Sequence, residues 1–169
     1  MGPVVGQVGQ VVVRRARPED LDAVGEITVA AYAEFTHGPD DGYIALLRDA
    51  SRRDREAELW VAELDGSVLG SVTIALPGSL WREIGREGEG EFRMLSVSPD
   101  ARRMGVGAAL ARLVVDRFRS LGFETIVMSS LSSMSAAHRI YERLGYHRMP
   151  ERDWSPQPGV DLIAFSKEL

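Results

Sequence analysis

Residues 94–118 read MLSVSPDARRMGVGAALARLVVDRF and connect the end of a strand to a long helix. Apolar side chains from Val106 to Phe118 recur every three or four residues, which is the spacing of one helix face. Gly122 is a typical helix terminator. The sequence therefore predicts a helix over residues 105–121 that buries one face.

The turn before this helix reads RRMGVGA (residues 102–108). The N-terminus of a helix offers unpaired N–H donors and the positive end of the helix dipole, and both attract phosphate. Gly105 and Gly107 let the backbone approach an oxyanion because they have no Cβ atom. Arg102 and Arg103 add positive charge, so the turn predicts a site for a pyrophosphate group.

Two well-known phosphate motifs do not fit this turn. The phosphate loop of nucleotide hydrolases ends in Gly-Lys-Ser/Thr, which is absent from the chain. The dinucleotide fingerprint needs a small residue where Leu110 stands. The alternative interpretation is a glycine turn that opens a helix beside solvated arginines.

The elements around this segment alternate between strands and helices. Strands are expected at 11–17, 59–64, 67–76, 91–97, 125–130, 146–149 and 160–167, and helices from Pro18 to about Ala31, at 43–53, at 105–121 and at 134–144. Asp65-Gly66 suits a two-residue hairpin turn between the second and third strands. This order predicts a mixed sheet with helices on its faces and a parallel strand–helix–strand unit in the middle.

Length and composition limit the class of protein. A chain of 169 residues, 44% hydrophobic and 27% charged, fits one globular domain over 11–169 after a loose glycine-rich tail, 1–10. The net charge of −5 disfavours a nucleic-acid partner. The absence of cysteine excludes disulfides, thiolate nucleophiles and cysteine zinc sites. The apolar run 4–13 is broken by polar residues, so we expect a cytoplasmic protein without a membrane span.

Two segments together resemble a known family. Residues 94–118 resemble the coenzyme-A signature of the GNAT superfamily of N-acetyltransferases, Arg/Gln-x-x-Gly-x-Gly/Ala, and residues 135–146 (SAAHRIYERLGY) resemble its second signature. The element order from 11 to 169 is also similar. The resemblance implies a mixed, mostly antiparallel central sheet with helices on both faces and a parallel, splayed strand pair. It also implies acetyl transfer from acetyl-CoA to an amine by direct attack in a ternary complex.

The resemblance assigns roles to particular residues. The N–H groups from Arg103 to Ala108 would bind the pyrophosphate, and the strand at 95–97 would run beside the pantetheine arm. The N–H near Leu95 would stabilise the oxyanion. The full cofactor-binding set is Leu95, Ser96, Val97, Arg102, Arg103, Met104, Gly105, Val106, Gly107, Ala108, Met134, Ala137 and Tyr141.

Tyr141 is expected to donate a proton to the departing thiolate. A phenol with a pKa of about 10 is protonated at neutral pH and can supply one. The alternative is a core aromatic packed beside Ile140 and Leu144. Met134 departs from the family, which often has asparagine there, and Ser132, Ser133 or Ser135 are candidate replacements for its contact with pantetheine.

The acceptor amine must lose a proton, and two residues are candidate bases. Glu91 begins the strand beside the thioester and is the first, acting directly or through water, and His138 is the second. For both, a surface or hydrogen-bonded residue is the competing interpretation.

The acceptor pocket is expected at two variable loops. Its candidate residues are Tyr32, Phe35, His37 and Tyr43, the acids Glu34, Asp40 and Asp41, and Asp153, Trp154 and Pro156. An aromatic box with acids suits a cationic amine, and a polar loop with a few packed rings is the alternative. The charged run 52–56 is interpreted as a solvated helix face.

Three functions remain open from the sequence. The first is an N-acetyltransferase for a small-molecule or peptide amine, with acetyl-CoA as its cofactor and no metal. The second is an inactive acyl-CoA-binding sensor or docking module, favoured by Met134 and by the lack of an obvious base. The third is an unrelated nucleotide binder. By analogy with similar proteins, a homodimer is a further hypothesis.

Overall fold

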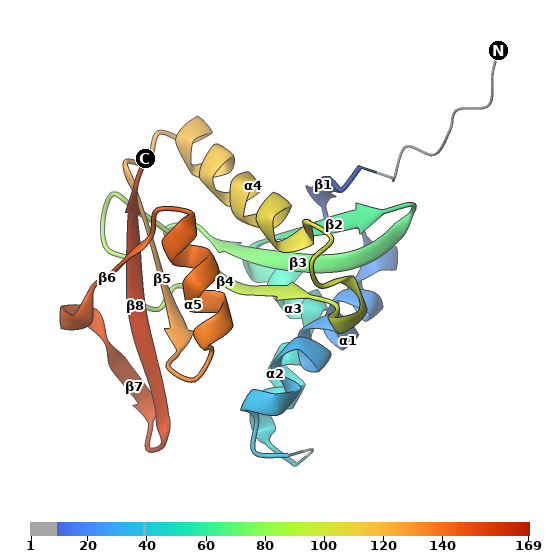
Figure 1. Cartoon of the computed structure of the whole chain (residues 1–169), viewed down its shortest axis with the longest axis horizontal. Coiled ribbons are helices and arrows are strands. Elements are labelled where there is room, and N and C mark those ends of the chain that lie inside the picture. Colours follow the sequence, from blue (N-terminus) through green and yellow to red (C-terminus); the bar gives the residue numbers. More distant parts are fainter. Residues whose placement is uncertain (1–9, 39) are drawn as a thin grey trace.

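The computed structural model describes residues 10–38 and 40–169, and Figure 1 shows their arrangement. The expected tail, 1–10, lies outside the described residues except for Gln10, which is exposed. Within the described parts, eight strands form one sheet: β1 (Val12–Arg15), β2 (Glu58–Leu64), β3 (Ser67–Ala75), β4 (Glu89–Val97), β5 (Thr125–Leu131), β6 (His147–Arg148), β7 (Trp154–Gln157) and β8 (Val160–Glu168). The strand order is β1-β2-β3-β4-β5-β8-β6, and β7 pairs with β8.

The expected mixed sheet is confirmed. Every strand pair is antiparallel except β4–β5, which is parallel. The helices are α1 (Leu21–Tyr32), α2 (Gly42–Arg48), α3 (Ala50–Glu56), α4 (Val106–Ser120) and α5 (Ser135–Arg143). Figure 1 shows α4 and α5 on one face of the sheet and α1 to α3 on the other. The sheet is therefore covered on both faces, as expected.

Local sequence chemistry explains the elements that were predicted well. Asp65 and Gly66 both have positive φ, 51° and 82°, which is the backbone of the hairpin turn that joins β2 to β3. The apolar face of α4 is buried against the sheet through Val106, Leu110, Val114 and Phe118. Both elements are specified by residues close together in the chain.

β4 and β5 separate after a short paired segment. Only Glu89, Gly90 and Glu91 pair with β5, opposite residues 125–127. Beyond Glu91 the two strands diverge, so the edge of β4 that faces β5 is left without a strand partner in the described structure. This splayed pair opens a gap in the middle of the sheet.

A β-bulge shapes β4 beside this gap. Ser96 pairs with Ser71 and Arg93 with Thr73, so Met94 and Leu95 together oppose a single residue of β3. Met94 has a positive φ of 52°, which is uncommon for a residue with a side chain. The bulge disrupts the β3–β4 ladder locally and turns the backbone at Leu95.

Three sequence-based expectations are corrected by the structure. The helix expected at 43–53 is two helices, because Asp49 leaves helical geometry and caps α3 through the N–H of Arg52. The loop expected between the strands at 146–149 and 160–167, which includes residues 153–159, contains strand β7. The solvated face expected at 52–56 is wrong for Arg53, which is fully buried and donates to the Leu46 and Leu47 carbonyls. Burial lowers the pKa of Arg53 to about 10.

Gly90→Ala is expected to destabilise the fold. A Cβ atom at Gly90 would lie 2.5 Å from Cδ1 of Phe118, a ring that is fully buried under α4. Overpacking of this kind costs about 1–3 kcal/mol, so the urea midpoint should fall. Gly42→Ala is the matched control, because that Cβ meets nothing within 4 Å. Equal midpoints for the two variants would contradict the tight packing at Gly90.

Candidate active site

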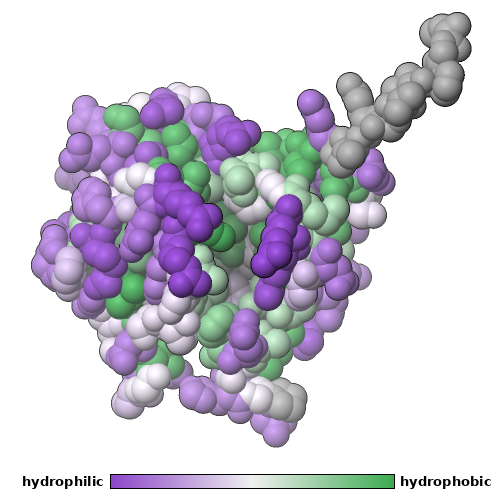
Figure 2. Space-filling model, in the orientation of Figure 1, coloured by the Kyte–Doolittle hydropathy of each residue, from purple (hydrophilic) through white to green (hydrophobic). Residues whose placement is uncertain are grey.

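A cavity of about 380 Å³ occupies the gap between β4 and β5. It is lined by Tyr32, Phe35, His37, Asp41, Tyr43, Leu46, Glu83, Phe92, Arg93, Met94, Leu95, Met128, Ser129, Ser130, Leu131, Met134, Tyr141, Pro156, Gln157, Val160 and Leu162. These residues come from α1 and α2 on one face of the sheet and from α5 on the other, so the cavity passes through the splayed pair. Figure 2 shows the molecular surface hollowed between α5 and β4.

The part of the cavity near α1 and α2 has mainly apolar walls. Six of the residues expected at the acceptor pocket line it: Tyr32, Phe35, His37, Asp41, Tyr43 and Pro156. Asp153 and Trp154 lie elsewhere, since Asp153 accepts from Arg148 and from the N–H of Ala164 and Trp154 pairs in β7. Glu34 and Asp40 also do not line it. The expected aromatic wall is therefore present with fewer acids.

Asp41 organises the loop of this wall. Its carboxylate accepts hydrogen bonds from the N–H groups of His37, at 3.0 Å, and Tyr43, at 3.0 Å. These two bonds hold the pKa of Asp41 below its ordinary value. The carboxylate therefore caps α2 and fixes the Tyr43 end of the wall.

Glu83 is a carboxylate in the cavity that the sequence did not single out. It belongs to the connection between β3 and β4, and its Oε1 lies 2.8 Å from Nε of Arg93 and 3.4 Å from Oγ of Ser129. Burial raises the pKa of Glu83 above its ordinary value of 4.5, with Arg93 opposing the rise and the neighbouring Glu91 adding to it. A largely buried carboxylate with a raised pKa, placed in a cleft, is suited to accept a proton.

Glu91, the first candidate base from the sequence, has a different environment. It is fully buried, and its carboxylate accepts hydrogen bonds from the N–H groups of residues 83–85, the closest at 2.8 Å from Gly85. Its oxygens are thus occupied by main-chain donors, and it is Glu83 that lines the cavity. The signal available in the sequence was the charged, glycine-rich connection PGSLWREIGREGEG (77–90), which lacks the periodicity that would orient a side chain.

Tyr141 lines the cavity from the α5 side. The residue is only 7% exposed, and its ring makes edge contacts with Phe92 and Tyr146, with centroids 6.1 and 5.9 Å apart. Burial raises the pKa of Tyr141 above its ordinary value of 10, so the phenol holds its proton more tightly than in water. Glu83 and Tyr141 thus reach the same cavity from opposite faces of the sheet.

His138, the second candidate base, does not line the cavity. Its Nε2 lies 3.1 Å from Oγ of Ser130, and its ring lies beside Phe165. Burial lowers the pKa of His138 below its ordinary value, so burial favours the neutral imidazole. Its position is that of a hydrogen-bonded support for β5.

The turn before α4 has the form of an anion site. Residues 102–105 are exposed, and Arg103 and Gly105 have positive φ values of 68° and 80°. Gly105 is the N-cap of α4, so the N–H groups of the first turn have no acceptor within the helix. Gly107 lies beside the end of β4, where a Cβ atom would make an ordinary contact of 3.5 Å with Val97. These residues fit a diphosphate.

The other expected cofactor-binding residues lie along the gap or near it. Leu95 belongs to the bulge, and Ser96 and Val97 end β4 after it. The Ser96 hydroxyl is buried and donates to the Met94 carbonyl. Met134 is the N-cap of α5 and lines the cavity. Ala137 packs against the main core. The backbone edge of β4 beyond Glu91 therefore lies along the gap.

Residues 10–38 and 40–169 contain no cluster of three or more His, Cys, Asp or Glu side chains that could hold a metal ion. None of their helices is long and apolar enough to span a membrane.

Solved structures of other proteins share this fold. An acetyltransferase of the GNAT family from Staphylococcus aureus Mu50 has a TM-score of 0.75 at 12% identity, covering 95% of this chain and 99% of that one. The PaiA N-acetyltransferase from Thermoplasma acidophilum, solved in complex with coenzyme A, has a TM-score of 0.70 at 15% identity, covering 95% of this chain and 99% of that one. These likenesses concern the fold alone.

Sequence similarity to known proteins identifies the family of this chain. A mycothiol acetyltransferase from Cellulomonas flavigena is 33% identical over an alignment of 162 residues, which covers 86% of this chain and 44% of that protein. The chain therefore spans less than half the length of this curated relative. The model of the acetyltransferase (GNAT) family matches residues 21–146, from the start of α1 to the end of the second signature. With the splayed strands and the open helix N-terminus already described, this match shows that the chain belongs to the GNAT family of acetyltransferases.

Proposed function

We propose that the protein transfers an acetyl group from acetyl-CoA to a primary amine by direct attack, with both molecules bound at one time. The observation that supports this most is the shared cavity. Glu83, Leu95 and Tyr141 line one space that opens to both faces of the sheet. A proton acceptor, a main-chain donor and a proton donor are the three groups that aminolysis of a thioester needs.

The chain's own backbone provides most of the proposed cofactor site. Acetyl-CoA, when bound, supplies the acetyl group as a thioester. The N–H groups of residues 103–108 would hold its diphosphate, aided by Arg102 and Arg103. The unpaired edge of β4 at 95–97 would hydrogen-bond the pantetheine arm as an added strand does.

Glu83 is the proposed general base. A primary amine has a pKa of about 10 and is mostly protonated at neutral pH, so it must lose a proton before it attacks. Glu83 lines the cavity and has its carboxylate held by Arg93 and Ser129. We assign it the role that the sequence gave first to Glu91, because the Glu91 oxygens are bound to the 83–85 backbone.

Tyr141 and Leu95 are the proposed groups on the leaving side. The Tyr141 hydroxyl would give its proton to the thiolate, and the N–H of Leu95 would stabilise negative charge on the carbonyl oxygen. The bulge supports this role for Leu95, because it disturbs the ladder that would otherwise use the main-chain groups there.

The acceptor is proposed to be a monoamine carried on an apolar or aromatic group. Tyr32, Phe35 and Tyr43 form one wall, and Val160 and Leu162 of β8 contribute to the lining. The two carboxylates in the lining are already engaged, Glu83 by Arg93 and Asp41 by its own loop. A second ammonium group on the acceptor would therefore find no free carboxylate.

A panel of amines tests the proposed function. Release of free thiol from acetyl-CoA should be faster with 2-phenylethylamine than with putrescine, by at least about tenfold in kcat/KM, since each apolar methylene buried is worth about 0.8 kcal/mol. A preference for putrescine would overturn the acceptor class. Tight binding of acetyl-CoA by calorimetry, with no turnover on aryl, alkyl or peptide amines, would favour the acyl-CoA-binding module instead. Glu83 supports the enzyme, because the module was favoured by the lack of a base.

A further inference from the structure

Glu91 is a fully buried carboxylate whose partners are main-chain N–H groups. Its two oxygens accept from Glu83, Ile84 and Gly85 at distances from 2.8 to 3.3 Å. Three successive N–H groups that point at one anion form a nest, which stabilises negative charge. A neutral glutamine has one acceptor oxygen in place of two. The turn therefore uses both carboxylate oxygens of Glu91 as acceptors.

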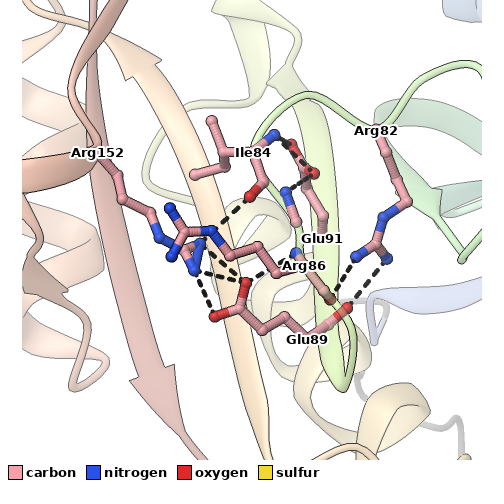
Figure 3. A network of polar contacts seen from close by, with 7 residues as sticks. Arg82, Ile84, Arg86, Glu89, Glu91 and Arg152 are labelled. Carbon is pink, nitrogen blue, oxygen red and sulfur yellow. Dashed lines mark hydrogen bonds and ion pairs between the residues drawn. The ribbon is translucent and has the colours of Figure 1, made fainter.

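The other side of the same turn is held by an arginine. Arg152, at the end of the 3-10 helix Pro150–Arg152, pairs with the Glu89 carboxylate at 2.7 Å and donates to the Ile84 carbonyl at 3.2 Å. Arg82 donates to the carbonyls of Glu89 and Arg86. Figure 3 shows the Ile84 peptide between the Glu91 carboxylate and the Arg152 guanidinium. The turn at 83–85 is thus held by Glu91 through its three N–H groups and by Arg152 through the Ile84 carbonyl.

The strand geometry connects this arrangement to the cavity. Glu91 is the last residue of β4 that pairs with β5, so its side chain is anchored where the two strands separate. One of its bonds, at 3.0 Å, is to the N–H of Glu83 itself. The turn that carries the proposed base is therefore hydrogen-bonded to β4 at the point where β4 and β5 separate.

The charges that face Glu83 come from several elements. Arg93 of β4 pairs with it, Glu91 of β4 lies behind it, Tyr43 of α2 shares the cavity, and the Ser129 hydroxyl of β5 donates to it. Arg93 favours the ionised carboxylate, whereas the like charge of Glu91 disfavours it. Glu91 therefore contributes charge as well as position.

We infer that Glu91 and Arg152 are positioning residues, which hold opposite sides of the Ile84 peptide and so direct the Glu83 side chain into the cavity. Glu91 also places a negative charge close to Glu83. This inference rests on the proposed function of Glu83 as base. It gives a role to the one carboxylate of β4 that neither touches the cavity nor forms an ion pair with an arginine in the described residues.

Two substitutions at Glu91 separate charge from position. Glu91→Gln keeps the length of the side chain and removes its charge. The acid limb of the pH profile of kcat/KM, where the rate rises with pH, should then move to lower pH by about 0.5–1 unit, because a like charge near Glu83 is lost. Glu91→Asp keeps the charge and shortens the reach, so kcat should fall about tenfold while the limb stays in place. In both variants KM for acetyl-CoA should change by less than about twofold, since Glu91 lies near the start of β4 and the proposed diphosphate site follows the other end of that strand, at the N-terminus of α4.

Glu58→Gln is the matched control. Glu58 is also largely buried, at 8% exposed, but it is bound by Arg117 and Trp60 away from the cavity. Its loss should reduce the free energy of unfolding without moving the acid limb. An acid limb that stays fixed in Glu91→Gln, or one that moves equally in Glu58→Gln, would overturn the charge role.

Arg152→Lys keeps the test decisive if the Glu91 variants do not fold. Lysine retains the charge beside Glu89 but not the paired geometry of the guanidinium. We expect kcat about three- to tenfold lower with the acid limb unchanged, and an unchanged kcat would refute the positioning role. Failure of the proposed function can be distinguished from failure of this inference, because in the first case the wild-type protein itself shows no turnover. The charge effect is then measured without turnover, by ¹³C NMR titration of the Glu83 carboxyl in wild type and in Glu91→Gln.

Discussion

Glu83→Gln is expected to lower kcat about 10²-fold or more at neutral pH, which is the usual contribution of a general base. The amide keeps the size of the side chain and its contact with Arg93, but it cannot take a proton. The measurement is thiol release from acetyl-CoA with saturating amine. Binding of acetyl-CoA, followed by calorimetry, should be unchanged.

The pH dependence makes this prediction specific. In wild type, activity should rise as pH increases through the pKa of Glu83, which burial places above the ordinary carboxyl value. Glu83→Gln should lose this limb, and its deficit should shrink toward pH 10, where about half of the amine is already neutral. Glu34→Gln is the control, because Glu34 is exposed on the same side of the molecule and does not line the cavity. A Glu83→Gln enzyme that keeps the acid limb would exclude Glu83 as the base.

Tyr141→Phe is expected to reduce kcat about 10- to 100-fold by removing the proton donor for the thiolate. The ring contacts with Phe92 and Tyr146 do not involve the hydroxyl, so the free energy of unfolding should change little. The deficit should narrow as pH rises above the pKa of a free thiol, about 8.5, because the thiolate then needs no proton. Pre-steady-state thiol release would place the defect in the transfer step.

Tyr146→Phe is the matched control for this substitution. Tyr146 lies in the same aromatic cluster and is 3% exposed, and its hydroxyl has no hydrogen-bond partner among the described residues. Removing that hydroxyl should leave kcat unchanged and should not lower stability. Equal activities for the two variants would show that the Tyr141 hydroxyl has no role in transfer.

The sequence determined the parts of this protein that depend on near neighbours in the chain. The apolar face of α4, the Asp65-Gly66 turn and the glycine turn before α4 are each specified within about fifteen residues, and each is present in the structure. The family signatures lie in the same kind of segment, 94–118 and 135–146, which is why the fold and family could be predicted. The cavity-lining positions of Tyr141 and Tyr43 also follow from helical spacing and loop placement.

Only the tertiary structure decided which carboxylate reaches the cavity. The connection at 77–88 has no period that fixes the direction of Glu83, and its course depends on the buried Glu91 and on Arg152, which is more than sixty residues away. The burial of Arg53 likewise depends on carbonyl acceptors in α2 and the Thr28 hydroxyl of α1. Side-chain direction in an irregular segment is set by the distant groups that satisfy its backbone, and a sequence read locally does not contain those partners.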